Sequence, residues 1–275
     1  MCIRDSLQTA DDLHQVTFEA LSIAAAAGVR YREMFFSPTF LMQHGVAFDT
    51  IWTGITAGIA DAATDHGIVC RMILDVHKPA GASAATELIE LAAACDRALL
   101  IGVGGDAGER DVDLRSFAEP FALARRLGLR TTMHLGEEGP AADIRIGIDE
   151  VGVERIDHGV SVVDDPALLA DVASRGVPVT ACPTSNLRIG IIDRLADHPV
   201  QRLRDAGVLV TLNSDNAEMF GIDLGDEMCA VRDAFGWGFD DVAAMCLQGV
   251  DSASSTNAER RSMRHSFSTV IDALR

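Results

Sequence analysis

Apolar positions recur along this chain with two different spacings. Short runs of β-branched and other apolar residues alternate with longer Ala- and Leu-rich stretches that have helical spacing. Alternation of this kind predicts a parallel sheet wrapped by helices. The expected helices include residues 84–95 and 116–127. The seven expected strands lie at residues 31–36, 68–76, 98–103, 130–134, 154–157, 177–181 and 208–213.

The spacing of these elements favours a TIM (β/α)8 barrel over a doubly wound sheet, although periodicity alone does not separate the two. A closed barrel of this type has eight strands, so the expected strands are one short. No internal repeat, low-complexity tract or Pro- and Ser-rich linker divides the chain. We therefore predict a single α/β domain over residues 1–275.

The first six residues stand apart from this pattern. They form a short polar and charged opening before a helix that we expect to begin near Thr9 or Ala10. Thr9 is a suitable cap, and the acidic pair Asp11 and Asp12 suits the positive end of the helix dipole. We interpret residues 1–6 as a start imposed on a longer gene.

Composition narrows the expected location and ligands. Hydrophobic residues make up 48% of the chain, but no apolar run reaches the roughly 18 residues of a membrane span. No secretion signal opens the chain, and the six cysteines are scattered singly, so we expect a cytoplasmic protein. A formal net charge of −18 disfavours nucleic acid and anionic membranes as partners. We expect a small neutral or weakly charged ligand; no feature indicates an oligomeric state.

Polar residues suited to chemistry lie directly after four of the expected strands. In a parallel barrel, these strand ends meet on one face, where active sites are assembled. The residues are Gly104-Gly105-Asp106, His134 with Glu137, His158, and Asp215 with Asn216.

The segment after the fourth expected strand combines a histidine with a carboxylate. Glu137 follows His134 by three positions, and Gly136 between them allows a tight turn. Neutral imidazole is a common zinc ligand, and a nearby carboxyl group can transfer protons. The alternative is a histidine hydrogen-bonded at a strand end beside a solvated glutamate, because so short a motif is weak alone.

His158 and Asp215 follow two further strands. Gly159 would expose the His158 ring toward the barrel mouth, although a core histidine is the alternative. Asp215 could ligate zinc, accept a hydrogen bond from its water, or cap the next helix. Two histidines and an aspartate at three strand ends, with Glu137 beside the first, together favour metal-assisted hydrolysis. Cys182 has a simpler interpretation, as a structural residue of a Cys-Pro turn.

Six motifs in this chain keep the order and spacing of a known family. They are YREMFFSP at residues 31–38, GGD at 104–106, HLGE at 134–137, RIDHG at 155–159, CPTSN at 182–186 and NSD at 213–215. They resemble the YxExRxSP, AGD, HAGE, RxGHG, CPxSN and NTDD motifs of the adenosine deaminase family of amidohydrolases. The resemblance covers the chain from about Leu7 to its end. It implies the metal-dependent hydrolase type of TIM barrel with its first strand missing.

The same resemblance implies a reaction and assigns roles in it. The reaction would be zinc-dependent hydrolytic deamination of adenosine to inosine and ammonia, or of a close adenine derivative, in purine salvage. His134 and Asp215 would be ligands of one zinc ion per chain. Glu137 would protonate purine N1, and His158 would orient or deprotonate the zinc-bound water. Gly105 would offer its backbone N–H to the purine ring of a nucleoside or base.

The chain departs from the family in its metal ligands. The amino-terminal HxH motif, which would supply two more zinc ligands, has no counterpart here. We interpret this departure as an amino-terminal truncation, and we expect the chain itself to bind zinc weakly or not at all. An inactive fragment or a non-catalytic purine-binding pseudoenzyme is the alternative, and an unrelated metal hydrolase on the same barrel is a third.

Asn216 is the second departure. It occupies the position where the family usually has a second aspartate facing purine N7. An asparagine can donate a hydrogen bond through its amide but cannot change charge. We therefore predict that Asn216 binds substrate, and the sequence leaves open whether adenosine, adenine or a modified adenine nucleoside is preferred.

Overall fold

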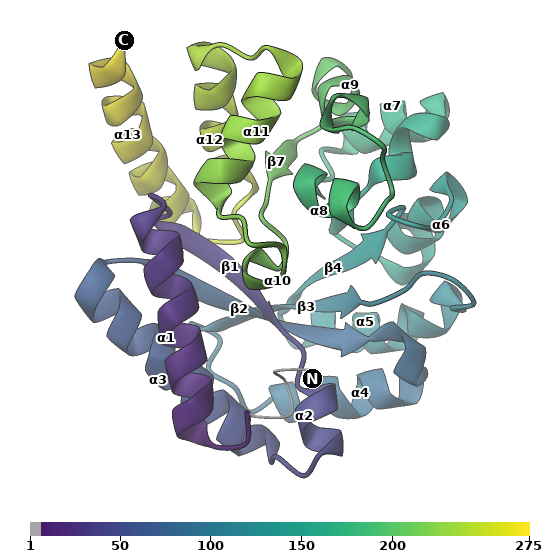
Figure 1. Ribbon diagram of the computed structural model, residues 1–275. Helices are drawn as coiled ribbons and strands as arrows, with labels where there is room; N and C mark the ends of the chain where they lie inside the picture. The colour runs from purple at the N-terminus through teal and green to yellow at the C-terminus, as the bar shows by residue number, and fades with distance from the viewer. Residues whose placement is uncertain (1–6) are drawn as a thin grey trace. The chain divides into compact units, whose positions relative to one another are not determined.

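Seven strands alternate with helices in a computed structural model of the protein, which describes residues 7–275 (Figure 1). The interpretation of residues 1–6 lies outside the described part. Contacts divide the chain into two compact units. The first runs to Gly108 and includes Val112–Thr132; the second combines Glu109–Asp111 with Met133–Arg275.

The first unit contains the first strands of the sheet and the helices between them. β1 pairs with β2, β2 with β3 and β3 with β4, all in parallel. The elements are α1 (Ala10–Ala26), β1 (Tyr31–Phe36), α2 (Thr39–Gln43), α3 (Phe48–His66), β2 (Val69–His77), a 3-10 helix (Lys78–Ala80), α4 (Gly81–Ala92), β3 (Leu100–Asp106), a 3-10 helix (Leu114–Phe117), α5 (Ala118–Arg126) and the start of β4 (Arg130–Leu135).

The first helix begins where the sequence predicts. The Thr9 hydroxyl accepts a hydrogen bond from the Asp12 backbone N–H at 3.1 Å. The Asp12 carboxylate in turn accepts one from the Thr9 N–H at 2.9 Å. This reciprocal pair satisfies two N–H groups that the first turn would leave unpaired, so it fixes the start of α1 at Ala10.

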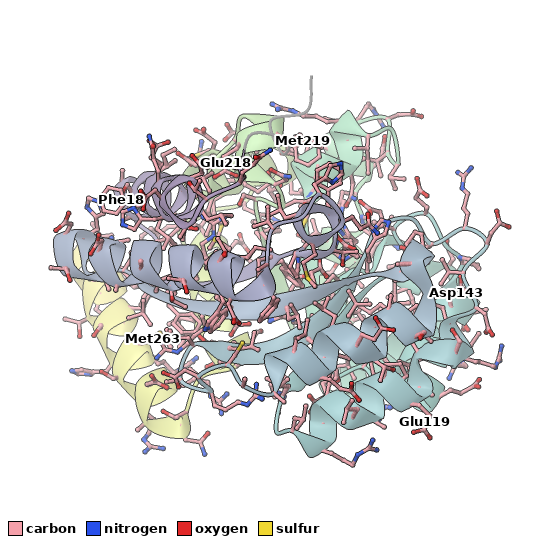
Figure 2. The ribbon with its side chains drawn as sticks, turned by 90° about the horizontal axis from the view of Figure 1, so that it is seen from below. Phe18, Glu119, Asp143, Glu218, Met219 and Met263 are labelled. Atoms are coloured by element: carbon pink, nitrogen blue, oxygen red, sulfur yellow. The ribbon has the colours of Figure 1, made fainter. Side chains whose placement is uncertain are left out.

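Helix α1 lies close against α3 because α3 has glycines at the contact. A Cβ atom at Gly54 would collide with the backbone oxygen of Ala10, and one at Gly58 would meet the backbone oxygen of His14 at 2.6 Å. Phe18 of α1, labelled in Figure 2, adds an aromatic contact in the same pair of helices, with its ring centroid 5.6 Å from that of His66. The missing side chains let the two backbones approach.

The third strand is longer than the sequence predicts. We expected the strand to end at residue 103 and Gly104-Gly105-Asp106 to follow it as a turn. This boundary is wrong, because Gly104 and Gly105 are in parallel register with Asp75 and Val76 of β2, and the strand ends at Asp106. The ladder with β2 overrides the turn preference of the glycines.

The second unit contains the remaining strands. β5 pairs with β6 and β6 with β7, again in parallel. The elements are the end of β4, α6 (Ala141–Ile146), a π-helical turn (Gly147–Val151), β5 (Arg155–His158), a 3-10 helix (Val160–Asp164), α7 (Pro166–Arg175), β6 (Val179–Ala181), α8 (Pro183–Arg188), a 3-10 helix (Leu195–Asp197), α9 (Val200–Asp205), β7 (Val210–Leu212), α10 (Ala217–Phe220), α11 (Leu224–Phe235), α12 (Phe239–Ser252) and α13 (Asn257–Leu274).

Parallel register in this unit places three strand ends side by side. Asp157 of β5 pairs with Thr180 of β6, and Ala181 of β6 pairs with Leu212 of β7. The residues that follow these pairs therefore leave the sheet at the same edge. Most residues of these strands are buried, and they include the polar residues Asp157, His158 and Thr211. No helix among residues 7–275 is both long and apolar enough to cross a membrane.

Candidate active site

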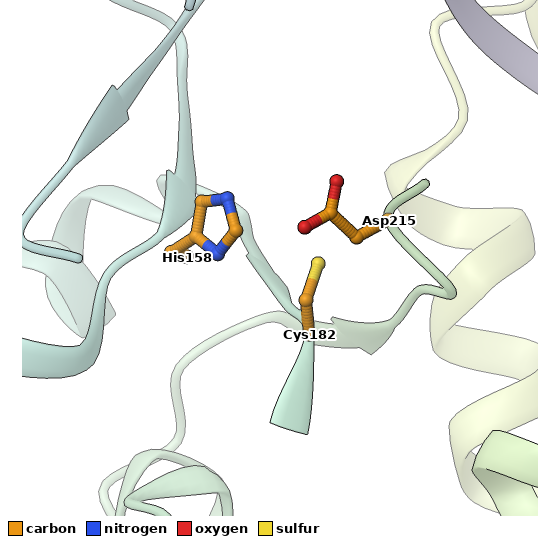
Figure 3. Close-up of side chains that lie close together, drawn as sticks. All are labelled: His158, Cys182 and Asp215. Atoms are coloured by element: carbon orange, nitrogen blue, oxygen red, sulfur yellow. The ribbon is translucent and has the colours of Figure 1, made fainter. Parts of the chain in front are cut away.

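Three side chains with metal-binding atoms meet at this edge of the second unit. One nitrogen of His158, the Cys182 sulfur and a carboxylate oxygen of Asp215 all lie within 4.8 Å of one another (Figure 3). His158 and Cys182 are buried, whereas Asp215 is exposed. The backbone is left-handed at His158, with φ of 67°, and at Asp215, with φ of 54°. Non-glycine residues rarely adopt this conformation, and those that do are concentrated at functional sites.

The sequence left open whether Asp215 binds a metal or caps the next helix, and the structure shows that a different residue, Asn216, is the cap. The Ser185 hydroxyl donates to Asp215 Oδ2 at 2.6 Å, which orients the carboxylate. Asn216 is the residue that caps the next helix, because its Oδ1 accepts from the Met219 N–H at 3.3 Å. The sequence alternative in which Asp215 caps that helix is therefore wrong. This hydrogen bond uses the Asn216 oxygen. The binding of substrate by its amide N–H groups stays a prediction.

Cys182 lies beside these residues, but its thiol is a poor nucleophile. Burial raises the pKa of the Cys182 thiol well above its ordinary value, and the carboxylates of Asp215 and Asp157 raise it further. The thiol therefore stays protonated at neutral pH in the absence of a metal ion. This agrees with the structural interpretation of Cys182, although the sequence did not place its sulfur among the candidate ligands.

His134, predicted as a zinc ligand, lies next to the three-residue group rather than within it. Its ring centroid is 4.6 Å from that of His158, with the planes inclined by 55°. Its Nδ1 is 3.9 Å from a carboxylate oxygen of the buried Asp157, and the Thr180 hydroxyl donates to the other oxygen of Asp157 at 2.8 Å. Asp157 thus places a carboxylate on the Nδ1 side of the His134 ring.

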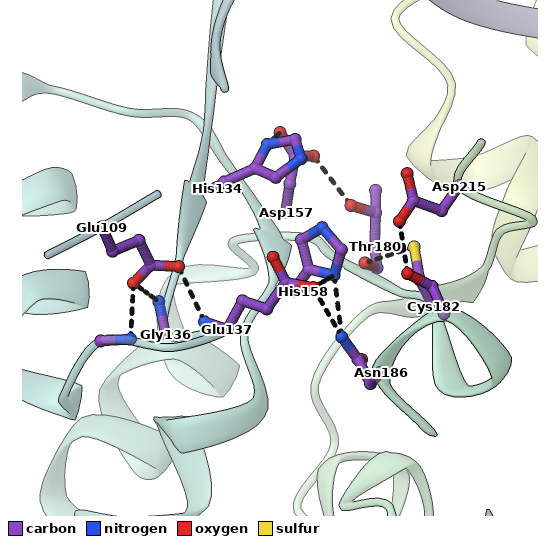
Figure 4. Close-up of polar contacts among 12 residues, drawn as sticks. Glu109, His134, Gly136, Glu137, Asp157, His158, Thr180, Cys182, Asn186 and Asp215 are labelled. Atoms are coloured by element: carbon purple, nitrogen blue, oxygen red, sulfur yellow. Dashed lines mark hydrogen bonds and ion pairs between the residues drawn. The ribbon is translucent and has the colours of Figure 1, made fainter. Parts of the chain in front are cut away.

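The loop after β4 is held by a buried carboxylate that the sequence did not single out. Glu109, 6% exposed, accepts backbone N–H bonds from Gly136 at 2.7 Å, Glu137 at 2.9 Å and Gly139 at 3.0 Å (Figure 4). Charge-assisted bonds to three amides fix the course of the loop. Glu109 therefore fixes the backbone from which the Glu137 side chain projects.

The turn in this loop requires glycine at position 136. The backbone of Gly136 is left-handed, with φ of 71°, and a Cβ would lie 2.5 Å from both the Ile144 Cδ1 and the Ser161 Oγ. We expect Gly136→Ala to lower the free energy of unfolding by about 3 kcal/mol, as the sum of backbone strain and overpacking. Gly128 has a similar φ of 77° but no atom within 4 Å of an added Cβ. Gly128→Ala should therefore cost only about 1 kcal/mol. Urea unfolding of both variants would measure the difference, and equal losses would contradict the steric part.

The Glu137 side chain points into a buried polar network. Its Oε1 accepts from the Asn186 amide nitrogen at 2.8 Å and lies 3.1 Å from the His158 Nδ1 (Figure 4). Asn186 is fully buried in α8, and its amide nitrogen is also 3.2 Å from the His158 Nδ1. The two residues predicted to transfer protons, Glu137 and His158, are thus brought into direct contact.

His198, behind this network, makes the stability of the fold depend on pH. Burial lowers the pKa of the His198 imidazole from 6.5 to about 4. The unfolded chain therefore takes up this proton first, so the contribution is fully present above pH 6.5 and is lost as the pH falls toward 4. We expect a loss of about 3 kcal/mol over this range from His198 alone. Urea unfolding between pH 7 and 4 should show a smaller decrease for His198→Gln, and identical profiles would contradict the assignment.

The structure therefore gathers most of the predicted site in one unit. His134, Glu137, His158, Asp215 and Asn216 all belong to the second unit. Gly105 belongs to the first unit, where it is buried in β3, and its contact with substrate stays a prediction.

Three residues of the site were not assigned roles from the sequence. Asn186 stands in the CPTSN motif, which was a usable signal for it. Glu109 and His198 have no motif that identifies a partner. They contact Gly136 and Asn186, which lie 27 and 12 positions away in the chain.

Scaffold and site together define a class of protein. Imidazole, carboxylate and thiol groups at the carboxyl ends of parallel strands are typical of a metal-dependent hydrolase of the TIM-barrel type. Comparison with known proteins identifies the family. The model of the adenosine deaminase family matches residues 1–270, and the chain belongs to this family of aminohydrolases.

The relatives and solved structures agree with this membership. An adenine deaminase of Streptomyces coelicolor is 39% identical over 84% of this chain and 67% of its own length. One of Sphingopyxis alaskensis is 36% identical over 92% and 74%. The crystal structure of an adenine deaminase from Arthrobacter aurescens superposes with a TM-score of 0.93 at 29% identity, covering 98% of this chain and 82% of that one. A zinc-bound amidohydrolase from Burkholderia ambifaria superposes with a TM-score of 0.91 at 28% identity, covering 98% and 75%. The predicted family and fold are confirmed.

Proposed function

We propose that this protein catalyses the zinc-dependent hydrolytic deamination of adenine or of a close adenine derivative. The proposal depends on the contact of Glu137 with His158, next to the strand ends that carry Cys182 and Asp215. A carboxyl group and an imidazole 3.1 Å apart provide the acid and the base that hydrolysis of an amidine requires.

The relatives favour the free base as substrate. The sequence implied adenosine or a close derivative, whereas the Streptomyces and Sphingopyxis relatives are both adenine deaminases. We therefore place adenine first and adenosine second. Asn216, which carries no charge, is consistent with a neutral purine as ligand.

The donor groups of the second unit fit a zinc ion. Imidazole nitrogen, thiolate sulfur and carboxylate oxygen are the three ligand types that zinc prefers. His134 and Asp215 would hold the ion, and the sulfur of Cys182 is a further donor beside Asp215. The zinc-bound amidohydrolase supports this choice of metal. When bound, zinc supplies an acidified water as the nucleophile.

The residues of this chain would manage the protons of the reaction. Water adds to the carbon that bears the amino group, the carbon–nitrogen bond breaks, and ammonia leaves. Glu137 would donate a proton to the adjacent ring nitrogen, which makes that carbon more electrophilic. His158 would orient the water or accept its proton. The contact between these two side chains gives a direct path for returning the proton.

A metal-reconstitution assay tests this function. The protein would be stripped with a chelator, reloaded with zinc, and supplied with adenine or adenosine while ammonia release and zinc content are recorded. Because we expect this chain to bind zinc weakly, the zinc is supplied in excess, and we expect ammonia release that depends on this excess and is faster from adenine. A version extended into the upstream reading frame tests the predicted HxH ligands, and higher zinc affinity in that version would support them. Zinc-loaded protein of both versions that binds a purine without releasing ammonia would establish the non-catalytic alternative.

A further inference from the structure

His198 is a buried histidine that the proposed reaction does not use. It follows the 3-10 helix Leu195–Asp197, is 2% exposed, and its Nδ1 lies 3.1 Å from the backbone N–H of Val200. A backbone amide can only donate, so Nδ1 must be the unprotonated nitrogen. The proton of the neutral ring is therefore on Nε2. The low pKa of about 4 that burial gives this imidazole keeps the ring neutral at physiological pH.

The protonated nitrogen of His198 faces Asn186. Its Nε2 is 3.3 Å from the Asn186 Oδ1, within the same buried region. Since Nε2 donates, the atom of the amide that faces it must be the oxygen. The amide nitrogen then faces the opposite way, toward Glu137 and the His158 Nδ1, at 2.8 Å and 3.2 Å.

The orientation of this amide matters because an asparagine side chain keeps its shape when it is turned by half a rotation. In the turned state, the oxygen of Asn186 would face Oε1 of Glu137. These two acceptors would repel each other unless the carboxyl proton sat on Oε1, where it would be held by Asn186 and not by the substrate. The hydrogen bond from His198 therefore selects the orientation of the Asn186 amide in which its nitrogen donates to Glu137.

We propose that His198 is a positioning residue that fixes the amide of Asn186 and, through it, the carboxyl group of Glu137. The proposal deepens the deaminase function proposed above and rests on it. His198 has no contact with the reacting atoms in this scheme. Its effect is to hold the general acid in one place before substrate binds.

A pair of substitutions separates the hydrogen bond from simple filling of space. His198→Leu fills the site without a donor, whereas His198→Gln retains an N–H that can reach the Asn186 oxygen. We expect His198→Leu to lower kcat for adenine by roughly 10- to 100-fold with KM changed by less than about twofold. His198→Gln should retain kcat within about threefold of the unchanged protein, because the donor remains. Equal kcat values in all three proteins would overturn the proposal while leaving the deaminase function intact.

Nuclear magnetic resonance gives a readout that does not depend on activity. In the unchanged protein, ¹⁵N signals of His198 should show the Nε2–H tautomer, and the side-chain amide protons of Asn186 should exchange slowly with solvent. His198→Leu should speed that exchange, and His198→Gln should restore it. A proton on Nδ1 of His198 would overturn the proposal even if His198→Leu does not fold. If the unchanged protein has no deaminase activity, the proposed function fails, and the tautomer and amide exchange still decide the positioning role.

Discussion

Replacing Glu137 with glutamine should lower kcat for adenine by roughly 10²- to 10⁴-fold, the range that a general acid contributes. Glutamine has almost the same size and can still pair with the Asn186 amide through its oxygen. It cannot donate and recover an acidic proton. Zinc content and thermal stability should therefore stay close to those of the unchanged protein, and the loss should appear in kcat under steady-state assay of ammonia release.

The neighbouring residue provides a matched control for this change. Glu138 is exposed, and its carboxylate is 3.8 Å from Arg110 Nε, a surface ion pair of little energetic value. Glu138→Gln removes the same charge one position further along and should leave kcat within about twofold. Comparable losses in the two variants would show that the charge of the loop, and not the acid at position 137, is what the reaction needs.

Asp215→Asn should abolish deamination by removing zinc. The change deletes one negative charge and one anionic ligand but keeps the shape of the side chain. Asparagine tolerates the left-handed backbone at this position, where φ is 54°, so folding should be preserved. Substituting a residue that hydrogen-bonds to a metal ligand typically lowers metal affinity by roughly 10- to 100-fold. Loss of the ligand's own charge should lower zinc affinity by at least as much. Zinc titration and metal analysis after dialysis would measure it.

A nearby exposed carboxylate controls for the loss of charge. Glu218, labelled in Figure 2, lies on α10 only three positions from Asp215. Glu218→Gln should leave zinc affinity and activity unchanged. If Asp215→Asn retains zinc with full affinity, Asp215 is not a ligand. A Cys182→Ser variant would then show whether the thiol is the donor that holds the metal.

The strands could be predicted from the sequence because short apolar and β-branched runs alternate with stretches that have helical spacing. The first strand was predicted with both of its ends correct, and the fourth, Arg130–Leu135, differed by one residue. Both strands contain polar residues, but Gly28 and Pro38 flank the first and Gly128 and Gly136 flank the fourth, and such residues mark strand ends. The predicted end of the third strand was wrong at Gly104 and Gly105. Their pairing with β2 is a long-range contact that local residue preferences do not reveal.

The candidate site was predictable only in part, and for a related reason. His134, Glu137, His158 and Asp215 follow strands, so the parallel topology alone predicts that they share an edge. Residues that hold these side chains in place without following a strand cannot be identified by this argument. Glu109 accepts hydrogen bonds from backbone N–H groups, which almost every residue has, so the sequence does not show which ones it binds. The choice of His198 over the other histidines depends on burial and hydrogen bonds, which the order of residues does not contain.

The left-handed backbone at the site has a consequence for protein engineering. Among the described residues, those other than glycine with positive φ are Ala107, Asp111, His158 and Asp215. A saturation library at positions 158 and 215 would therefore be filtered by folding before any selection for activity. Valine, isoleucine and threonine should disappear from the expressed pool, while asparagine and glycine persist. Sequencing the soluble fraction of such a library, with no substrate present, would separate the residues that the backbone admits from those that the chemistry needs.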